Sequence, residues 1–222
     1  MIVVVSATRL TSDDFFTKSL LGLSLSHCRN HPHIRLRIFF ENTVGLGAAY
    51  NAAISEAQPD DILVFVHDDV LLLDYLWPSR ILWGLQTFDI LGVAGNIRRV
   101  PKQPCWWLNE RGTRDDPQYL SGVVAHGNGL PFNLSVFGQT FQHCKLLDGL
   151  FLVTKKTTLA SANLRFDPQF DFHFYDMDFC RQAEILHVSM GTLPLAIMHA
   201  SRGARDISWK ENWERYLEKW KE

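Results

Sequence analysis

The sequence contains no apolar run that reaches the ~18 residues needed for a membrane-spanning helix. Its first residues lack the basic stretch and the apolar segment of a secretory signal peptide. We therefore expect a soluble, cytoplasmic protein. This expectation leaves open whether the protein acts at a membrane surface. No internal repeat, low-complexity tract or linker interrupts the 222 residues, which predicts a single domain over residues 1–222.

Paired cysteines and excess positive charge are absent as well. Cys28, Cys105, Cys144 and Cys180 form no C-x-x-C pair, so neither a zinc cluster nor a disulfide framework is predicted. Reduced thiols are what a cytoplasmic protein would carry. The formal net charge of -2 lacks the basic excess of nucleic-acid-binding proteins, so no nucleic-acid partner is expected.

Two catalytic signatures are also missing. The loop from Ser6 to Leu10, which follows the first expected strand, contains no glycine, whereas a nucleotidyltransferase needs a glycine-rich, basic phosphate loop there. No G-x-S-x-G elbow is present, which argues against a serine hydrolase. The sequence disfavours both classes of enzyme.

The most informative stretch that is present begins with five apolar residues, Ile62 to Val66, followed by His67, Asp68 and Asp69. Such a run is typical of a strand buried on both faces of a parallel sheet. Ligands bind at the carboxyl ends of strands in open α/β sheets. Adjacent carboxylates repel each other unless a cation lies between them, and His67 adds a third ligand type. The pattern favours a divalent metal site over an acidic loop that caps the next helix.

Strand and helix patterns alternate along the first half of the chain, which is typical of a doubly wound α/β protein. The expected strands cover residues 2–5, 34–40, 62–66, 90–94, 120–125, 146–153 and 192–198, and the expected helices cover 12–25, 48–57, 79–88, 155–162, 174–190 and 208–220. Residues 97–145 are predicted to form long loops with short strands. The predicted fold class is α/β, with a mostly parallel central sheet flanked by helices and a C-terminal amphipathic helix.

Five motifs occur in an order that resembles a known family. They are Asn42-x-x-Gly45-Leu46-x-x-x-Tyr50-Asn51, His67-Asp68-Asp69, Leu147-Asp148-Gly149, Phe166-Asp167 followed by Tyr175-Asp176-x-Asp178-Phe179-Cys180, and His199-Ala200-Ser201. Together they resemble the family 2-like glycosyltransferases, from about Val3 to His199. The resemblance implies a GT-A-type, Rossmann-like domain that transfers a sugar from a nucleotide-diphosphate donor.

The resemblance also implies a divalent metal, Mn²⁺ or Mg²⁺, that bridges the donor diphosphate. Such a cation neutralises the charge that develops on the leaving nucleoside diphosphate. The implied metal ligands are Asp69 and His199. His67 replaces the first aspartate of the family's aspartate-x-aspartate motif, where contact with the ribose or the metal is implied for His67 and Asp68. This replacement leaves the identity of the metal open.

Asp176 matches the family's general base, which takes the proton of the acceptor hydroxyl in an inverting displacement. The alternative is that Asp176 and Asp178 favour a helix N-terminus through the helix dipole. Tyr175 stands where the family has a glutamate, and Asp171 and Asp178 remain substitute bases. Acids two residues apart point to different sides of a helix, so Asp176 and Asp178 cannot both face the acceptor.

The remaining donor-binding residues implied by the resemblance are Ser6, Ala7, Arg9, Asn42, Gly45, Asn51, Asp148 and Gly149. A β-bulge is the alternative for Asp148-Gly149. Trp106 and Trp107 suit either stacking on a sugar or burial in the core. Arg202 and Arg205 suit either a diphosphate grip or a solvated loop.

The leading hypothesis is an inverting, metal-dependent glycosyltransferase that uses a nucleotide-sugar donor. The alternative is a non-catalytic nucleotide-sugar or glycan-binding module on the same fold. The acceptor stays open between a glycan, a lipid-linked molecule and a protein. Membership of a larger enzyme or of a homo-oligomer is open too.

Overall fold

The strand predicted to be central does lie in the middle of a sheet. The computed structural model describes residues 1–201, 203 and 206–222. In spatial order, the first sheet contains β11 (Met190–Thr192), β5 (Ile90–Gly92), β10 (Phe151–Lys155), β3 (Ile62–Val66), β1 (Ile2–Ala7) and β2 (Ile34–Phe39). Three of its five pairings are parallel, and the two that involve β10 are antiparallel. The carboxyl end of β3 therefore lies between the carboxyl end of the parallel β1 and the amino end of the antiparallel β10.

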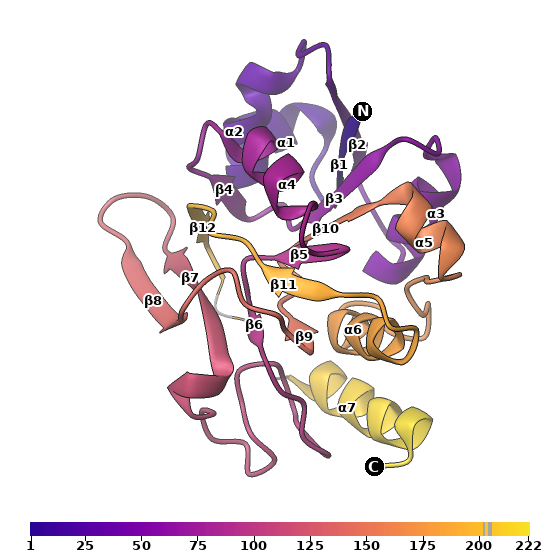
Figure 1. The fold of residues 1–222 in the computed structure, drawn as a ribbon. Helices are drawn as coiled ribbons and strands as arrows, with labels where there is room; N and C mark the ends of the chain where they lie inside the picture. The colour runs from indigo at the N-terminus through magenta and orange to yellow at the C-terminus, as the bar shows by residue number, and fades with distance from the viewer. Residues whose placement is uncertain (202, 204–205) are drawn as a thin grey trace.

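Helices cover both faces of this sheet. The described helices are α1 (Ser12–Lys18), α2 (Leu20–Leu25), α3 (Leu46–Glu56), α4 (Trp77–Gly84), α5 (Lys156–Ser161), α6 (Tyr175–Ile185) and α7 (Ile207–Trp220), with 3-10 turns η1 (Ser26–Cys28) and η2 (Pro117–Tyr119). Figure 1 shows α1, α2 and α4 on one side of the sheet and α3, α5 and α6 on the other. Among the described residues, no helix combines the length and apolarity that a membrane crossing requires.

A second sheet takes two of its strands from residues 97–145, which the sequence predicted to be long loops with short strands. Its order is β4 (Val70–Leu72), β12 (Ile197–His199), β7 (Leu120–His126), β6 (Ala94–Asn96) and β9 (Leu146–Leu147), and β8 (Asn133–Gly138) also pairs with β7. β7 is the predicted strand at 120–125. β8 was missed, because its side chains are exposed or half-buried and its short alternation of polar and apolar residues leaves Leu134 and Val136 exposed. Residues 97–145 thus contribute β7 and β8 to the second sheet and are otherwise mostly loop, as predicted.

The chain crosses between the two sheets five times, at the connections β3 to β4, β4 to β5, β5 to β6, β9 to β10 and β11 to β12. The predicted single strand 146–153 is therefore two strands in different sheets, separated at Asp148-Gly149-Leu150. The predicted strand 192–198 is also divided, and Pro194 lies in the connection, where its missing N–H removes no ladder hydrogen bond. A periodicity argument sees one apolar run in each case and cannot assign its halves to different sheets.

Two predicted helices differ in extent from the observed ones. The segment 12–25 is broken at Ser19, whose hydroxyl accepts a hydrogen bond from the Gly22 N–H (2.8 Å) and so starts a new helix. The helix predicted over 174–190 ends at Ile185, and His187 adopts a positive φ of 55° soon afterwards. The turn frees residues 190–192 to join the first sheet.

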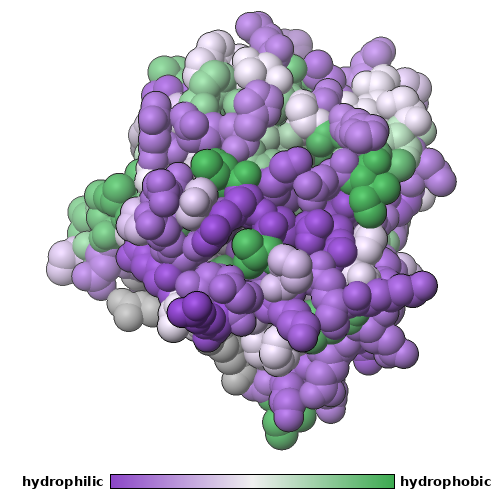
Figure 2. Space-filling view, turned by 60° about the horizontal axis from the view of Figure 1, so that its bottom comes forward, coloured by the Kyte–Doolittle hydropathy of each residue, from purple (hydrophilic) through white to green (hydrophobic). Residues whose placement is uncertain are grey.

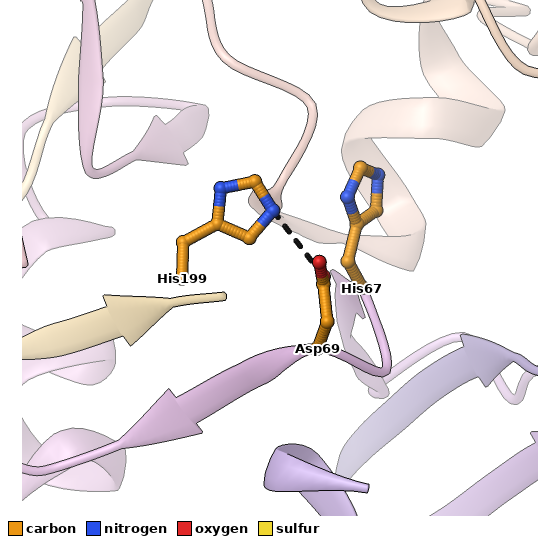
Figure 3. Close-up of side chains that lie close together, drawn as sticks. All are labelled: His67, Asp69 and His199. Atoms are coloured by element: carbon orange, nitrogen blue, oxygen red, sulfur yellow. Dashed lines mark ion pairs between the residues drawn. The ribbon is translucent and has the colours of Figure 1, made fainter. Parts of the chain in front are cut away.

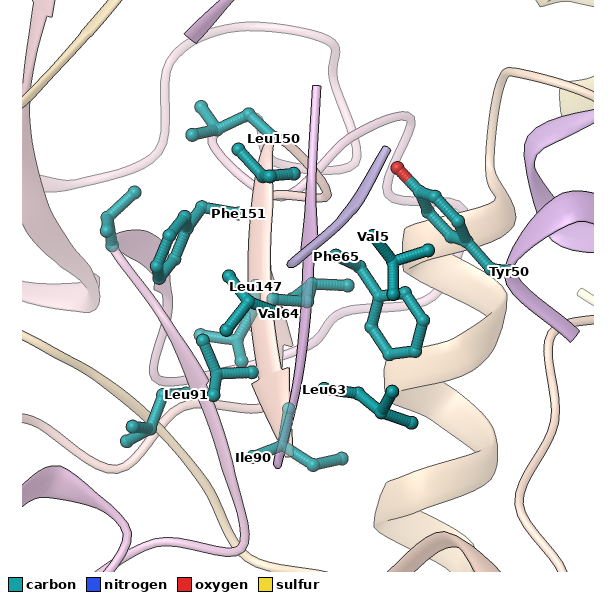
Figure 4. Close-up of a cluster of buried hydrophobic side chains, with 14 of the residues drawn as sticks. Val5, Tyr50, Leu63, Val64, Phe65, Ile90, Leu91, Leu147, Leu150 and Phe151 are labelled. Atoms are coloured by element: carbon teal, nitrogen blue, oxygen red, sulfur yellow. The ribbon is translucent and has the colours of Figure 1, made fainter. Parts of the chain in front are cut away.

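The hydrophobic core lies around β3 and joins both sheets. Leu63, Val64 and Phe65 are fully buried, and the Tyr50 ring from α3 packs at a tilt against Phe65 with 4.9 Å between the ring centroids. Figure 4 shows this cluster, in which Leu147 of β9 and Phe151 of β10 also take part. Burial of each such side chain contributes about 1.5–3 kcal/mol. This packing fixes the strand ends that carry the polar residues described below.

The C-terminal helix α7 packs through one face, as predicted. Trp209, Trp213, Leu217 and Trp220 are packed against the core, and Tyr216 is fully buried. The molecule is turned in Figure 2 so that the end carrying α7 comes forward, and hydrophilic residues predominate there while apolar ones form small separate groups. The amphipathic pattern of residues 208–220 therefore reflects the packing of one face of α7 against the core.

A buried ion pair ties α7 to α6. Lys219 Nζ lies 2.7 Å from Asp178 Oδ1, and Asp178 is completely buried. Replacing Lys219 by alanine is expected to lower the free energy of unfolding by about 3 kcal/mol, because it leaves a buried carboxylate without its cation. Urea unfolding measures this change. Lys210→Ala on the same helix is the control, since its pair with Glu214 (3.9 Å) is exposed and should contribute less than about 0.5 kcal/mol. Equal effects of the two substitutions would contradict the expectation.

Candidate active site

Three potential metal ligands converge where the chain passes between the sheets. His67 follows β3, Asp69 precedes β4, and His199 ends β12, which pairs with β4. The ligand atoms of these three residues all lie within 4.8 Å of one another. Figure 3 shows the two imidazoles on either side of the Asp69 carboxylate, and His199 Nε2 is 3.2 Å from Asp69 Oδ1. The sequence predicted that Asp69 and His199 would meet, and they do.

The electrostatics of the three residues favour an ionised carboxylate between two imidazoles. Burial by itself would raise the pKa of Asp69, but the hydrogen bond and charge of His199 outweigh it and hold the pKa below its usual range. Burial would likewise lower the pKa of His199, but Asp69 outweighs it and raises the pKa. For His67 burial dominates and lowers the pKa, so this ring is neutral near pH 7. A neutral imidazole is the form that binds a metal.

This donor set fits a divalent metal. One carboxylate and two imidazoles are common ligands of first-row divalent ions. An ion with bonds of about 2.1 Å joins ligand atoms at most about 4.2 Å apart. Because the ligand atoms lie within 4.8 Å of one another, side-chain movements of only about half an ångström would bring them to metal-binding distances. His67 would be a ligand from the position where the family has an aspartate.

The two positions that depart from the family pattern are in contact with each other. His67 Nε2 lies 2.7 Å from the Tyr175 hydroxyl, and this hydroxyl donates to the Gly149 carbonyl oxygen at 2.8 Å. Phe172 stacks on the His67 ring with 6.0 Å between centroids. Sequence reasoning missed the pairing of His67 with Tyr175, although the coincidence of two departures in one chain was the signal for it.

Asp176 stands at the first turn of α6, beside Asp148. Its Oδ2 accepts a hydrogen bond from the Gly149 N–H (3.0 Å) and its Oδ1 accepts one from the Met177 N–H (2.8 Å). Burial, and then the charge of Asp148, raise the pKa of Asp176 to about 6 despite these hydrogen bonds. A carboxylate with a pKa close to the working pH is suited to general-base chemistry.

The two substitute bases lie elsewhere. Asp178 is completely buried and bound to Lys219 and to Trp220 Nε1 (2.9 Å), so it cannot reach an acceptor. Asp171 is exposed, and its carbonyl oxygen accepts the Leu46 N–H at 2.6 Å. Asp171 does not line the cavity described below, whereas Asp176 does.

The predicted nucleotide-binding loops meet next to Asp68. The Thr8 hydroxyl donates to Asp68 Oδ2 (2.5 Å), and the Asn42 N–H donates to the Thr8 carbonyl oxygen (2.8 Å). Thr8 was missed by the sequence analysis, although it lies between two residues that were chosen. Ser6 is fully buried in β1, Ala7 is half-buried at its end, and Arg9 is exposed in the loop. The loop after β1 and the loop after β2 are thus joined to the end of β3.

Three of the proposed donor-binding residues have a structural task. The Asn51 side-chain amide bonds to both the N–H and the carbonyl oxygen of Phe166 (3.1 and 2.7 Å), so it holds that loop in place. A Cβ at Gly45 would lie 2.7 Å from the Asp171 Cα. A Cβ at Gly149 would lie 2.3 Å from the Tyr175 hydroxyl oxygen. Both glycines are therefore required for close packing, and Gly149 permits the Tyr175 hydrogen bond.

A cavity of about 600 Å³ opens beside these groups. His67, Asp148, Asp176 and His199 line one part of it, and the rest of the lining comes from the segment 104–114, from β7 and β8, and from residues near α6 and α7. The aromatic lining residues are Trp106, Trp107, Phe137, Phe172, Phe174, Tyr175 and Trp209. Trp106 is buried and Trp107 is half-buried, so the former serves the core as well as the cavity. Arg202 and Arg205, considered above for the diphosphate, lie outside the described residues.

The mixed sheet and its flanking helices form a GT-A-type fold, with an acidic segment at the end of β3. A profile described as "Glycosyltransferase like family" matches residues 37–201, and the chain belongs to this family. No match was found among the curated proteins.

Solved structures resemble the chain at low sequence identity. A197 from STIV matches with a TM-score of 0.51 and 10% identity, over 93% of this chain and 97% of that one. The catalytic domain of Drosophila beta1,4-galactosyltransferase 7, in complex with xylobiose, matches with a TM-score of 0.52 and 11% identity, over 96% and 79% of the two chains. A mutant of that Drosophila enzyme, in complex with manganese, UDP-Gal and xylobiose, matches with a TM-score of 0.46 and 11% identity, over 86% of this chain and 64% of that one. The first two similarities establish the fold.

Proposed function

We propose that the protein transfers a sugar, with inversion, from a nucleotide-diphosphate donor to an acceptor bound in the cavity. The observation that carries this proposal is the position of Asp176, a carboxylate with a raised pKa that faces the cavity close to the His67, Asp69 and His199 group. A base next to a site for a cation and a space for a second substrate is the minimum that such a displacement requires.

The chain's own residues perform the proton transfer and the positioning. Asp176 takes the proton of the acceptor hydroxyl while the acceptor oxygen forms its bond to the anomeric carbon. The bond from that carbon to the diphosphate oxygen breaks, and the electron pair leaves with the diphosphate. Burial, and then the charge of Asp148, keep the pKa of Asp176 raised and so keep this carboxylate basic. A divalent ion held by His67, Asp69 and His199 would neutralise the charge that collects on the diphosphate.

The donor and the acceptor would approach the metal ligands from different sides. Thr8, Asn42 and Asp68 form a polar group at the ends of β1, β2 and β3, suited to the nucleoside part of the donor. The cavity lies on the side of Asp176 and carries the aromatic residues. Aromatic rings offer flat apolar faces on which sugar rings stack, so we propose a carbohydrate acceptor that contacts Trp107.

A thermal-shift screen of nucleoside diphosphates with and without Mn²⁺ tests the donor site. At a ligand concentration of 100 times Kd, binding adds about 2.7 kcal/mol, which corresponds to a rise in Tm of about 5–10 °C for a chain of this size. We expect uridine or guanosine diphosphate to stabilise the protein only when metal is present.

Inorganic pyrophosphate with the same metal is the control, because it shares the bridging group and lacks the base. Equal stabilisation by all nucleoside diphosphates with and without metal, in the wild type and in Asp69→Ala alike, would contradict the proposal.

A further inference from the structure

The hydrogen bonds around His67 determine which of its nitrogens faces the cation site. The Tyr175 hydroxyl has a single proton, and the Gly149 carbonyl oxygen, 2.8 Å away, can only accept a hydrogen bond. The phenolic proton is therefore committed to Gly149. His67 Nε2, which lies 2.7 Å from the Tyr175 oxygen, must supply the proton of its own hydrogen bond. This leaves the lone pair of a neutral His67 ring on Nδ1.

The ring is also fixed in orientation. Phe172 stacks on the His67 ring with an interplanar angle of 26°. The backbone N–H of His67 donates a hydrogen bond to the Leu150 carbonyl oxygen (3.1 Å). The centroids of the His67 and His199 rings are 6.0 Å apart. Hydrogen bonding of one imidazole nitrogen, combined with stacking, is how proteins usually aim the other nitrogen at a metal.

We propose that His67 Nδ1, the Asp69 carboxylate and His199 Nε2 form a site that selects a first-row transition ion and discriminates against Mg²⁺ and Ca²⁺. Tyr175 is the positioning residue of this site. The inference rests on the proposed function for the place of the metal and does not depend on turnover.

The reason for the selectivity is the chemical nature of the ligands. Imidazole nitrogen suits Fe²⁺, Co²⁺, Ni²⁺ and Zn²⁺, whereas Mg²⁺ and Ca²⁺ prefer oxygen ligands. An aspartate in place of His67 would supply a second carboxylate and reduce this preference. Two imidazoles and one carboxylate also leave coordination positions open for diphosphate oxygens. Affinity is expected to rise in the order Mg²⁺, Mn²⁺, Fe²⁺, Co²⁺.

Calorimetric titration of the full chain with Mg²⁺, Mn²⁺ and Co²⁺ salts, without any donor, tests the selectivity. We expect Co²⁺ to bind at least about 100-fold more tightly than Mg²⁺. In the Mn²⁺-loaded protein, pulsed electron paramagnetic resonance should detect couplings to two imidazole nitrogens, and to one in His67→Asp. The His67→Asp variant should also narrow the gap between Co²⁺ and Mg²⁺.

Tyr175→Phe tests the positioning role, because it removes the hydroxyl and keeps the ring. Loss of the partner that fixes the tautomer should weaken Co²⁺ and Mn²⁺ binding by about 10- to 100-fold. Tyr216→Phe is the matched control, since Tyr216 is as buried as Tyr175 (1% and 2% exposed) and lies on α7.

Any one of three results would overturn the inference. These are equal affinity for Co²⁺ and Mg²⁺, a single coupled nitrogen in the wild type, and unchanged metal binding in a folded Tyr175→Phe variant. An inactive protein that binds Co²⁺ through two imidazoles would overturn the proposed function alone, so the two failures are distinguishable. If Tyr175→Phe fails to fold, the wild-type titration and the His67→Asp spectrum still decide the matter.

Discussion

Replacement of Asp176 by asparagine is expected to reduce the rate of sugar transfer by about 100- to 10,000-fold, the usual contribution of a general base. Asparagine keeps the size of the side chain and an oxygen for the Gly149 N–H, but it cannot take a proton. Product formation at saturating donor and metal measures the effect. Donor binding should be unchanged, because the substitution leaves the Thr8, Asn42 and Asp68 group untouched.

The pH dependence of the wild type should carry the same signature. Since Asp176 must be ionised to act, kcat/KM should rise with pH and level off above about 6, the pKa to which burial and Asp148 raise this carboxyl. Asp171→Asn is the discriminating variant, because Asp171 lies outside the cavity and its side chain should be dispensable. A large loss of activity in Asp171→Asn with retention in Asp176→Asn would reassign the base.

The stability of the Asp176→Asn variant provides an independent readout. The folded-state pKa of Asp176, about 6, is above the ordinary value of 3.8, so the folded protein binds this proton more tightly than the unfolded chain. Ionisation therefore costs nothing below about pH 4 and reaches its full cost above about pH 6. At 1.36 kcal/mol per pKa unit, that cost is up to about 3 kcal/mol. Relative to the wild type, the variant should gain stability as pH rises from 4 to 6, measured by urea unfolding.

Replacement of Asp69 by alanine is expected to abolish metal-dependent donor binding and to lower transfer by at least about 100-fold. Asp69 supplies the negative charge among the three ligands and lies between the two imidazoles. Without Asp69, only the neutral ligands His67 and His199 would remain, and no negative charge would offset the cost of removing water from the divalent cation. Metal titration and the metal-dependent rise in Tm measure the loss together.

Two further variants make this result interpretable. Asp69 Oδ2 also accepts the Ser201 N–H at 3.3 Å, so Asp69→Asn, which retains a carbonyl oxygen, separates loss of charge from loss of that hydrogen bond. Asp60→Asn is the control, because Asp60 is an exposed aspartate at the opposite end of β3. Undiminished metal-dependent binding in Asp69→Ala would place the cation elsewhere.

The sequence was sufficient for the elements whose burial is continuous. β1 and β3 are apolar on both faces, and α7 has one apolar face, so their patterns identify them without knowledge of the rest. The convergence of Asp69 with His199 was predictable because the family resemblance places both at strand ends. The extent of the domain, 1–222, stays a prediction.

The second sheet could not be predicted from local patterns. Its pairings join segments far apart in the sequence, such as Met198 with Ala125 and Gly95 with Leu147, and no periodicity within one segment records its partner. The strand β8 alternates polar and apolar residues only from Asn133 to Val136, and its apolar Leu134 and Val136 are exposed, so the alternation does not mark a buried face. The His67 and Tyr175 contact joins residues 108 positions apart, so no local pattern records it, and only the coincidence of two departures from the family pattern pointed to it.

The passage of the chain from one sheet to the other at His67–Asp69 and at Asp148–Leu150 has a consequence for distant substitutions. Asp148 belongs to a connection between sheets, whereas Asp176 belongs to α6, so the offset of the layers sets the separation of the two acids. A repacked core beneath β9 or β10 that lets one layer slide by a fraction of an ångström would alter their mutual repulsion. Such a substitution touches no ligand, yet it would move the pH optimum of the protein.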